Sequence, residues 1–120
     1  MEILRKVTIL LVIGVVVVAS ACKSEFEKIR SSGDVQLLYK NAYKYYEEKE
    51  YQKAQTLFEL IVSSYRGKKE AEDIYFKYAY TYYYLERYIL ASYYFKNFAQ
   101  TFSTSSLRQE ADFMTAYCNY

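Results

Sequence analysis

Alanine and aromatic residues recur in this chain at an offset of 37 residues. Ala42, Ala79 and Ala116 fall in register, and tyrosines follow each of them one and four residues later. An aromatic residue also precedes each alanine by three positions. A fixed period of about 20–50 residues is typical of repeat architectures, in which each unit packs mainly on its neighbours. The chain is therefore expected to fold as a stack of similar units.

Each copy of the repeat has the pattern of two helices joined by a short turn. The chain has no proline and only three glycines, so little interrupts a helix. The expected helices cover residues 35–48, 51–65, 70–85 and 88–102, and a fifth runs from about 106 to 120. The fold prediction is all-α, a helical-hairpin solenoid of two full repeats, 34–70 and 71–107, and a partial third, 108–120.

Three residues are expected to mark helix ends. Asp34 is the predicted N-cap of the first helix, because its carboxylate can accept from the backbone amides of the first turn. Gly67 is the predicted left-handed stop of the second helix, directly after Arg66. Ser106 with Gln109 has the spacing of a capping box that would open the fifth helix.

Alanines are expected where the two helices of a hairpin cross. Helices approach to about 8 Å only where the side chains between them are small. Ala42 is predicted to face Ala54, and Ala79 to face Ala91. Large aromatics, Tyr45, Tyr51 and Phe58 in the first copy, would fill the space around the crossing. This arrangement resembles the tetratricopeptide pattern, with a period three residues longer than the usual 34.

The first 21 residues have the composition of a signal peptide. Arg5 and Lys6 precede an uncharged run from Val7 to Val18, and Ala19-Ser20-Ala21 leads to Cys22. A basic start, a short apolar stretch and a small-residue exit are typical of secretory signals. The apolar run is short for a membrane span, which needs about 20 residues.

Two peptidases could cut before Cys22. Small-small-Cys resembles the bacterial lipobox, in which the cysteine is lipidated; an ordinary signal peptidase would leave a free thiol at Cys22 instead. An exposed thiol is a liability in an oxidising compartment, so lipidation of Cys22 is the prediction. Residues 22–33 would then form a lipidated cysteine and a tether, which fully extended would reach roughly 35 Å.

Composition excludes several classes of function. The chain has no histidine, and its two cysteines lie far apart, so neither the usual catalytic dyads nor a metal site is expected. The 16 basic and 14 acidic residues nearly balance, which argues against nucleic acid as a partner. Glu47, Glu48 and Glu50 are expected to be a solvated turn. The prediction is a binding module with no catalytic residues, no metal and no cofactor.

Several stretches beyond the repeat spacing carry a more specific resemblance. They are Tyr51-Gln52-Lys53-Ala54, Tyr65-Arg66-Gly67, Ala71-Glu72, the run from Tyr88 to Phe98, and Ala116-Tyr117-Cys118. Together with a lipidated cysteine and a tether, these make residues 22–120 resemble the BamD-type outer-membrane lipoproteins of the β-barrel assembly machinery. In family members a proline usually follows the aromatic residue that ends the second repeat, whereas here Ser103 follows Phe102. Family members also have about five repeats.

The resemblance implies a non-enzymatic scaffold on the periplasmic face of the outer membrane, anchored through lipid on Cys22. Its implied partners are a BamA-type β-barrel protein, other lipoproteins of the assembly complex, and unfolded outer-membrane proteins. The alternative is a lipid-anchored tetratricopeptide adaptor of another envelope assembly system, serving pilus or secretion assembly. An enzyme is a third reading, for which the sequence shows no constellation of acid, base and nucleophile.

The repeated aromatics form the predicted binding site. Stacking of the repeats would place them in three rows along the concave surface, as a groove for an extended peptide. The predicted groove residues are Tyr39, Tyr43, Tyr46, Phe76, Tyr80, Tyr83, Phe113, Tyr117 and Tyr120. The alternative is packing between repeats. Lys40, Lys44 and Lys77 beside the rows could meet a terminal carboxylate or form a solvated face, and Cys118 is expected to be buried.

Overall fold

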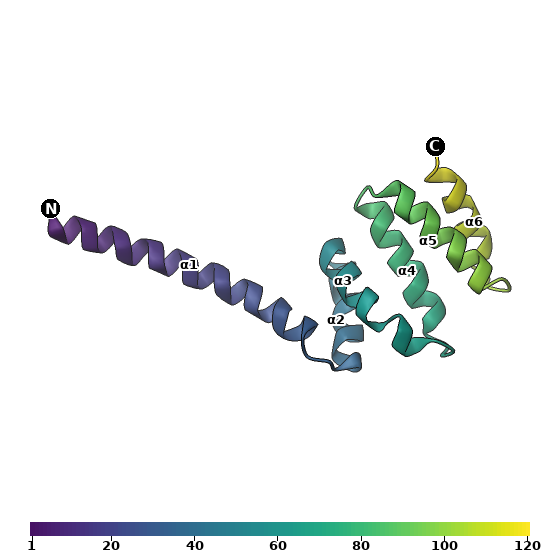
Figure 1. The fold of residues 1–120 in the computed structure, drawn as a ribbon, viewed down its shortest axis with the longest axis horizontal. Coiled ribbons are helices and arrows are strands. Elements are labelled where there is room, and N and C mark those ends of the chain that lie inside the picture. The colour runs from purple at the N-terminus through teal and green to yellow at the C-terminus, as the bar shows by residue number, and fades with distance from the viewer. The chain divides into compact units, whose positions relative to one another are not determined.

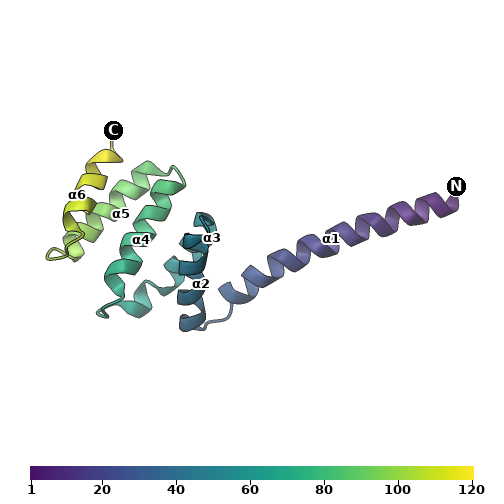
Figure 2. The same ribbon diagram turned by 180° about the vertical axis from the view of Figure 1, so that it is seen from behind.

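The computed structural model describes the backbone of residues 1–120 and the side chains of residues 1–13 and 25–120. The chain divides into two units, Met1–Ser32 and Gly33–Tyr120. Every regular element in the part of the chain so described is helical (Figures 1 and 2). The elements are α1 (Glu2–Arg30), α2 (Val35–Glu47), α3 (Tyr51–Ile61), η1 (Ser63–Tyr65), α4 (Ala71–Tyr84), α5 (Tyr88–Thr101) and α6 (Arg108–Tyr117).

The first unit is the single helix α1, which ends at Arg30 and so includes most of the predicted tether. A helix rises about 1.5 Å per residue, which is less than half the rise of an extended chain. The tether is therefore shorter than the length expected for an extended segment. The side chain of Cys22, the predicted lipidation site, lies outside the described residues. Among the helices as far as they are described, none is long and apolar enough to cross a membrane.

The second unit consists of helical hairpins, as the 37-residue period predicted. Each helix from α2 to α6 packs on the next one along the chain, and Figure 1 shows α4, α5 and α6 as successive neighbours. The first repeat comprises α2 and α3 with the short 3-10 helix η1, and the second comprises α4 and α5. The predicted helix of residues 51–65 is divided, since α3 ends at Ile61.

The turns within the two hairpins have the same unusual backbone. Lys49 and Glu86, which are 37 residues apart, both have φ of 61°. In each turn the left-handed residue donates to the carbonyl three residues before it, and the next residue donates to the carbonyl five before itself, as Glu50 does to Tyr45 at 2.8 Å and Arg87 to Tyr82 at 2.9 Å. This is the Schellman arrangement, which most helices complete with glycine.

Two of the three predicted helix ends are confirmed. The Asp34 carboxylate accepts from the amides of Gln36 and Leu37, and Gly67 has φ of 80°. The capping box at Ser106 is wrong. α6 begins at Arg108, and the hydroxyl that accepts from the Leu107 amide, at 3.0 Å, belongs to Ser105. Ser105 is held there because its hydroxyl also donates to Glu72 of α4, a contact that no local pattern reveals.

The alanine positions are buried as predicted. Ala42, Ala54, Ala79 and Ala91 have no exposed surface, which fits close crossings of α2 with α3 and of α4 with α5. The largest fully buried side chains around them are Phe58, Phe95, Phe98, Leu57, Ile61 and Ile74. The core therefore lies between the two helices of each hairpin and continues from one hairpin to the next.

Candidate functional site

The predicted rows run across the repeats, so each first helix contributes one aromatic residue to each row. The three that α2 contributes pack within their own hairpin. The ring centroids of Tyr39 and Tyr65 lie 5.3 Å apart, those of Tyr43 and Phe58 lie 5.5 Å apart, and Tyr46 meets Tyr51 at 5.5 Å. Tyr39, Tyr43 and Tyr46 are all partly buried. Their rings are therefore part of the α2–α3 contact.

The three aromatic residues that α4 contributes to the rows pack in a similar way. Phe76 is buried and meets Phe98 at 5.1 Å, Tyr80 meets Phe95 edge to face at 4.9 Å, and Tyr83 meets Tyr88 at 5.8 Å. Phe95 and Tyr88 of α5 occupy the positions of Phe58 and Tyr51 in α3, 37 residues earlier. Tyr80 and Tyr83 thus have partners equivalent to those of Tyr43 and Tyr46, whereas Phe76 meets Phe98, which stands at the position of Ile61.

The hydroxyls of this packing join one repeat to the next. Tyr43 donates to the carboxylate of Asp73 in α4, and Tyr80 donates to that of Glu110 in α6. Both acceptors lie in the first turn of their helices, where the amide dipoles favour negative charge. Burial, followed by these hydrogen bonds, raises the pKa of both tyrosines, so the phenols stay protonated donors. Packing between repeats, the alternative to a binding groove, therefore also gives these hydroxyls hydrogen-bond partners.

Lys77 contacts the same two residues, Tyr43 and Asp73, that connect the first repeat to the second. Its Nζ lies 3.0 Å from Asp73 Oδ1 and 5.4 Å from the centre of the Tyr43 ring. The ammonium group is therefore already neutralised within the protein. Lys40 and Lys44, by contrast, are exposed on α2, consistent with a solvated face.

The aromatic residues of the third repeat differ from those of the first two, because their rings face solvent. Phe113 is 61% exposed, Tyr117 is 55% exposed, and their rings stack with centroids 5.7 Å apart. Tyr120 is fully exposed, and Ala116 is exposed although Ala42 and Ala79 are buried. We call Phe113, Ala116, Tyr117 and Tyr120 the α6 face.

A pocket of about 620 Å³ lies over the α6 face. Tyr83 from α4 and Tyr88 from α5 complete its lining, together with Cys118. Tyr83 and Tyr117 rings are 6.1 Å apart, so the α6 face continues onto the end of the second hairpin. Cys118 itself is buried, as predicted. The pocket offers flat apolar rings with hydroxyls at their edges, which suits a polypeptide segment with aromatic or aliphatic side chains.

The nine predicted groove residues therefore do not form three open rows. The structure places Tyr39, Tyr43, Tyr46, Phe76 and Tyr80 in packing contacts, and brings only Tyr83, Phe113, Tyr117 and Tyr120 together around the pocket. The reason is that in each of the first two repeats a second helix packs on the aromatic residues of the first helix. Peptide binding by the open residues stays a prediction.

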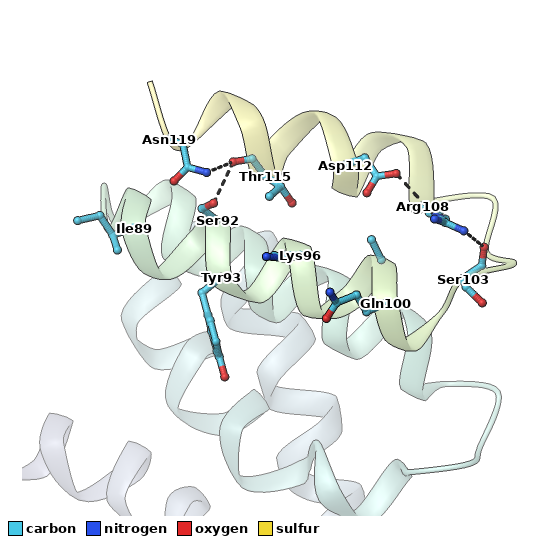
Figure 3. A pocket seen from close by; sticks show the side chains of 11 residues that line it. Ile89, Ser92, Tyr93, Lys96, Gln100, Ser103, Arg108, Asp112, Thr115 and Asn119 are labelled. Atoms are coloured by element: carbon cyan, nitrogen blue, oxygen red, sulfur yellow. Dashed lines mark hydrogen bonds and ion pairs between the residues drawn. The ribbon is translucent and has the colours of Figure 1, made fainter.

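A second, more polar groove lies between α5 and α6 (Figure 3) and has a volume of about 830 Å³. The Ser92 hydroxyl of α5 donates to the carbonyl of Thr115 in α6 at 2.9 Å, and Arg108 pairs with Asp112 toward the other end of the groove. Lys96 lies between these two contacts in Figure 3.

Three exposed apolar residues of α5 were missed by sequence reasoning. Ile89 is 84% exposed, and Leu90 and Tyr93 are about half exposed. The first repeat has Gln52, Lys53 and Thr56 at these positions. Folding of a hairpin of this type therefore does not need apolar side chains here, and a comparison of the two copies would have identified the patch.

A comparison of the sequence with protein-family models finds no matching family, and a comparison with curated proteins finds no significant match.

Proposed function

We propose that this protein is a non-enzymatic scaffold of the tetratricopeptide type that binds polypeptide segments at the α6 face. The observation that carries the proposal is the exposed stack of Phe113 and Tyr117 beside Ala116. Large exposed aromatic patches on small proteins mark interaction surfaces, and tyrosine gives rigid contact area at low cost in side-chain entropy.

The segments bound are those of unfolded outer-membrane proteins, and the scaffold belongs to the β-barrel assembly complex with its BamA-type protein and other lipoproteins. The resemblance of residues 22–120 to BamD-type lipoproteins supports this part. Outer-membrane strands carry aromatic girdles, which match the chemistry of the pocket. In this proposal residues 1–21 are removed, and lipid on Cys22 holds the protein on the periplasmic face of the outer membrane.

Site-specific photo-crosslinking in cells would test the proposal. A benzophenone amino acid in place of Tyr117 should capture unfolded outer-membrane proteins or the BamA-type protein. The same probe in place of Lys69, which is exposed in the turn before α4, is the matched control and should capture neither. Capture of pilus or secretion components at Tyr117 would assign the scaffold to another envelope system. Equal capture patterns at the two positions would contradict binding at the α6 face.

A further inference from the structure

Tyr51 and Tyr84 bring two phenol rings into direct stacking where the first repeat meets the second. Their ring centroids lie 4.4 Å apart and their planes differ by 16°, and no other pair of tyrosine rings in the described part of the chain lies closer. Tyr51 is the first residue of α3, and Tyr84 is the last residue of α4. Tyr84 is 45% exposed and Tyr51 is partly buried, so one ring of the pair is open to solutes.

The stacked geometry suits a covalent bond between the two rings. Two aromatic rings that are joined directly by a carbon–carbon bond have their centres at nearly the separation seen here. The rings must turn out of the parallel stack to form the bond, and the last torsion of a tyrosine side chain is broad. Both residues also lie at helix ends, where the backbone adjusts more easily than within a helix. Bond formation therefore needs ring rotation and small local shifts, and the repeats stay in contact.

We propose that Tyr51 and Tyr84 are a site of oxidative cross-linking, at which a peroxide-derived one-electron oxidant joins the two rings by a carbon–carbon bond as dityrosine. The proposal is independent of what the protein binds, because it concerns only the contact between α3 and α4.

The reaction balances with hydrogen peroxide as the terminal oxidant. A haem peroxidase that has reacted with hydrogen peroxide takes one electron from each phenol, and each hydroxyl proton passes to water. The two phenoxyl radicals couple through the ring carbons next to the hydroxyl-bearing carbons. The hydrogen on each coupled carbon then moves, through water, to the oxygen of its ring, which restores two phenols joined by one new bond. The two electrons and two protons that are lost convert one hydrogen peroxide into two water molecules.

Neighbouring tyrosines enlarge the area through which this pair can be oxidised. The ring of Tyr84 lies 5.5 Å from that of Tyr83, 5.7 Å from that of Tyr80 and 6.3 Å from that of Tyr46. A radical on any of these rings can take an electron from Tyr84 across a single ring contact. The hydroxyl of Tyr80 also donates a hydrogen bond to the carboxylate of Glu110, which can take up the proton when the ring is oxidised. Radicals formed around Tyr84 therefore reach a ring that is stacked on a second tyrosine.

Another stacked pair, Tyr82 and Tyr94, has nearly the same geometry but a different environment. Its ring centroids lie 4.6 Å apart, and the planes differ by 17°. Tyr82 is only 8% exposed, and its hydroxyl is hydrogen-bonded to that of Tyr78 within the core. A dissolved oxidant does not reach this ring, and solvent is not at hand to accept its proton. The buried pair therefore provides an internal control for the exposed one.

A bond between Tyr51 and Tyr84 would connect the first repeat covalently to the second. The chain between the two residues would become a closed loop, and such a link stabilises a fold mainly by restricting the unfolded chain, as a disulfide does. In repeat proteins each unit depends on contact with its neighbour, so a link between two units keeps that contact in place. The cross-linked protein should therefore melt at a higher temperature than the unmodified protein.

Peroxidase treatment of the full chain, kept dilute and in mild detergent, tests the proposal. Monomers are isolated by size exclusion, digested with trypsin and analysed by mass spectrometry. Cleavage after lysine and arginine releases Tyr51 in residues 50–53 and Tyr84 in residues 78–87. The expected product is these two peptides joined, lighter than their sum by two hydrogen atoms, with fragmentation placing the bond at Tyr84. The treated monomer should melt roughly 5 °C or more above the untreated one.

Three phenylalanine variants identify the pair. Tyr51→Phe and Tyr84→Phe each remove one phenol and keep the ring, so circular dichroism before treatment should match that of the wild type. Each should lose both the joined peptide and the rise in melting temperature. Tyr94→Phe is the matched control at the buried pair and should keep both.

Three results would overturn the proposal. The first is a wild-type monomer whose tyrosines are oxidised but which does not contain the joined peptide of residues 50–53 and 78–87. The second is a joined peptide that persists in Tyr84→Phe, which would place the bond at another tyrosine of residues 78–87. The third is dityrosine found only in dimers, since the bond would then form between molecules.

Discussion

Tyr43 of α2 donates a hydrogen bond to Asp73 in the first turn of α4, and the same pairing recurs 37 residues later between Tyr80 and Glu110. These contacts connect one repeat to the next, as do other polar contacts such as that of Gln55 in α3, which donates to the hydroxyl of Thr81 in α4 at 3.1 Å. The repeated tyrosine is therefore a structural residue in the first two copies, although its sequence pattern is that of an aromatic binding row.

Tyr43→Phe should lower the free energy of unfolding by about 1–2 kcal/mol, since a hydrogen bond to a carboxylate is lost and the acceptor is only partly exposed. Urea denaturation followed by circular dichroism would measure the change. Tyr93→Phe, at a position that is 57% exposed, is the matched control and should change stability little. An equal decrease in the free energy of unfolding in both variants would show that the hydrogen bond from Tyr43 to Asp73 does not stabilise the contact between the repeats.

Stability should fall as the pH rises above 10. Burial and the carboxylate partners raise the pKa of Tyr43 and Tyr80 above the ordinary value of 10.0. Above that pH the unfolded phenols lose their protons while the folded ones keep them, so the unfolded state binds fewer protons and is favoured. Below pH 10 the contribution is fully present.

Urea midpoints from pH 8 to 11 would measure this dependence. Tyr43→Phe should flatten the decline, because one of the shifted groups is gone. A variant whose midpoints fall as steeply as those of the wild type would place the alkaline sensitivity elsewhere.

Leucine at the alanine positions should separate buried crossings from the open one. Ala79→Leu adds three carbons to a fully buried crossing, and overpacking of this kind typically costs about 1–3 kcal/mol. Ala116→Leu at the equivalent exposed position should cost almost nothing. Thermal melting of the two variants measures the difference, and similar melting temperatures would mean that the α6 face is covered within this chain.

Glu86→Gly should stabilise the protein by roughly 1 kcal/mol. Glu86 has φ of 61°, a conformation that is strained for residues with a Cβ atom and free of strain for glycine. The greater entropy of glycine in the unfolded chain reduces the gain. Glu48→Gly, next to the left-handed Lys49 but with φ of −79°, is the control and should destabilise. A loss of stability in Glu86→Gly would show that the side chain makes compensating contacts.

Lipid on Cys22 predicts that the protein fractionates with membranes. Metabolic labelling with a palmitate analogue should mark the wild type and leave Cys22→Ser unlabelled and released in soluble form. Cys118→Ser tests the other cysteine, which is buried, and should keep the label. A soluble, unlabelled wild type would favour ordinary signal cleavage before Cys22.

The hairpins, their turns and the alanine crossings were predictable from the sequence because they depend on local spacing. The 37-residue period, the lack of proline and the cap at Asp34 each act within a few turns of helix. The capping box at Ser106 was wrong because Ser105 is held by Glu72, 33 residues away. Local patterns identify which residues can cap a helix but not which one a distant carboxylate selects.

The sequence by itself determined that the same three aromatic positions recur in each repeat, whereas the tertiary structure decided in which repeat they are open. Tyr43, Tyr80 and Tyr117 are identical in type and spacing, yet only Tyr117 is exposed. The physical reason is that the burial of a side chain depends on what packs on it from elsewhere in the chain, and α3 and α5 pack on the aromatic residues of the first two repeats. A repeat pattern records the residues that form a contact surface, and only the neighbouring helices show whether that surface is already occupied.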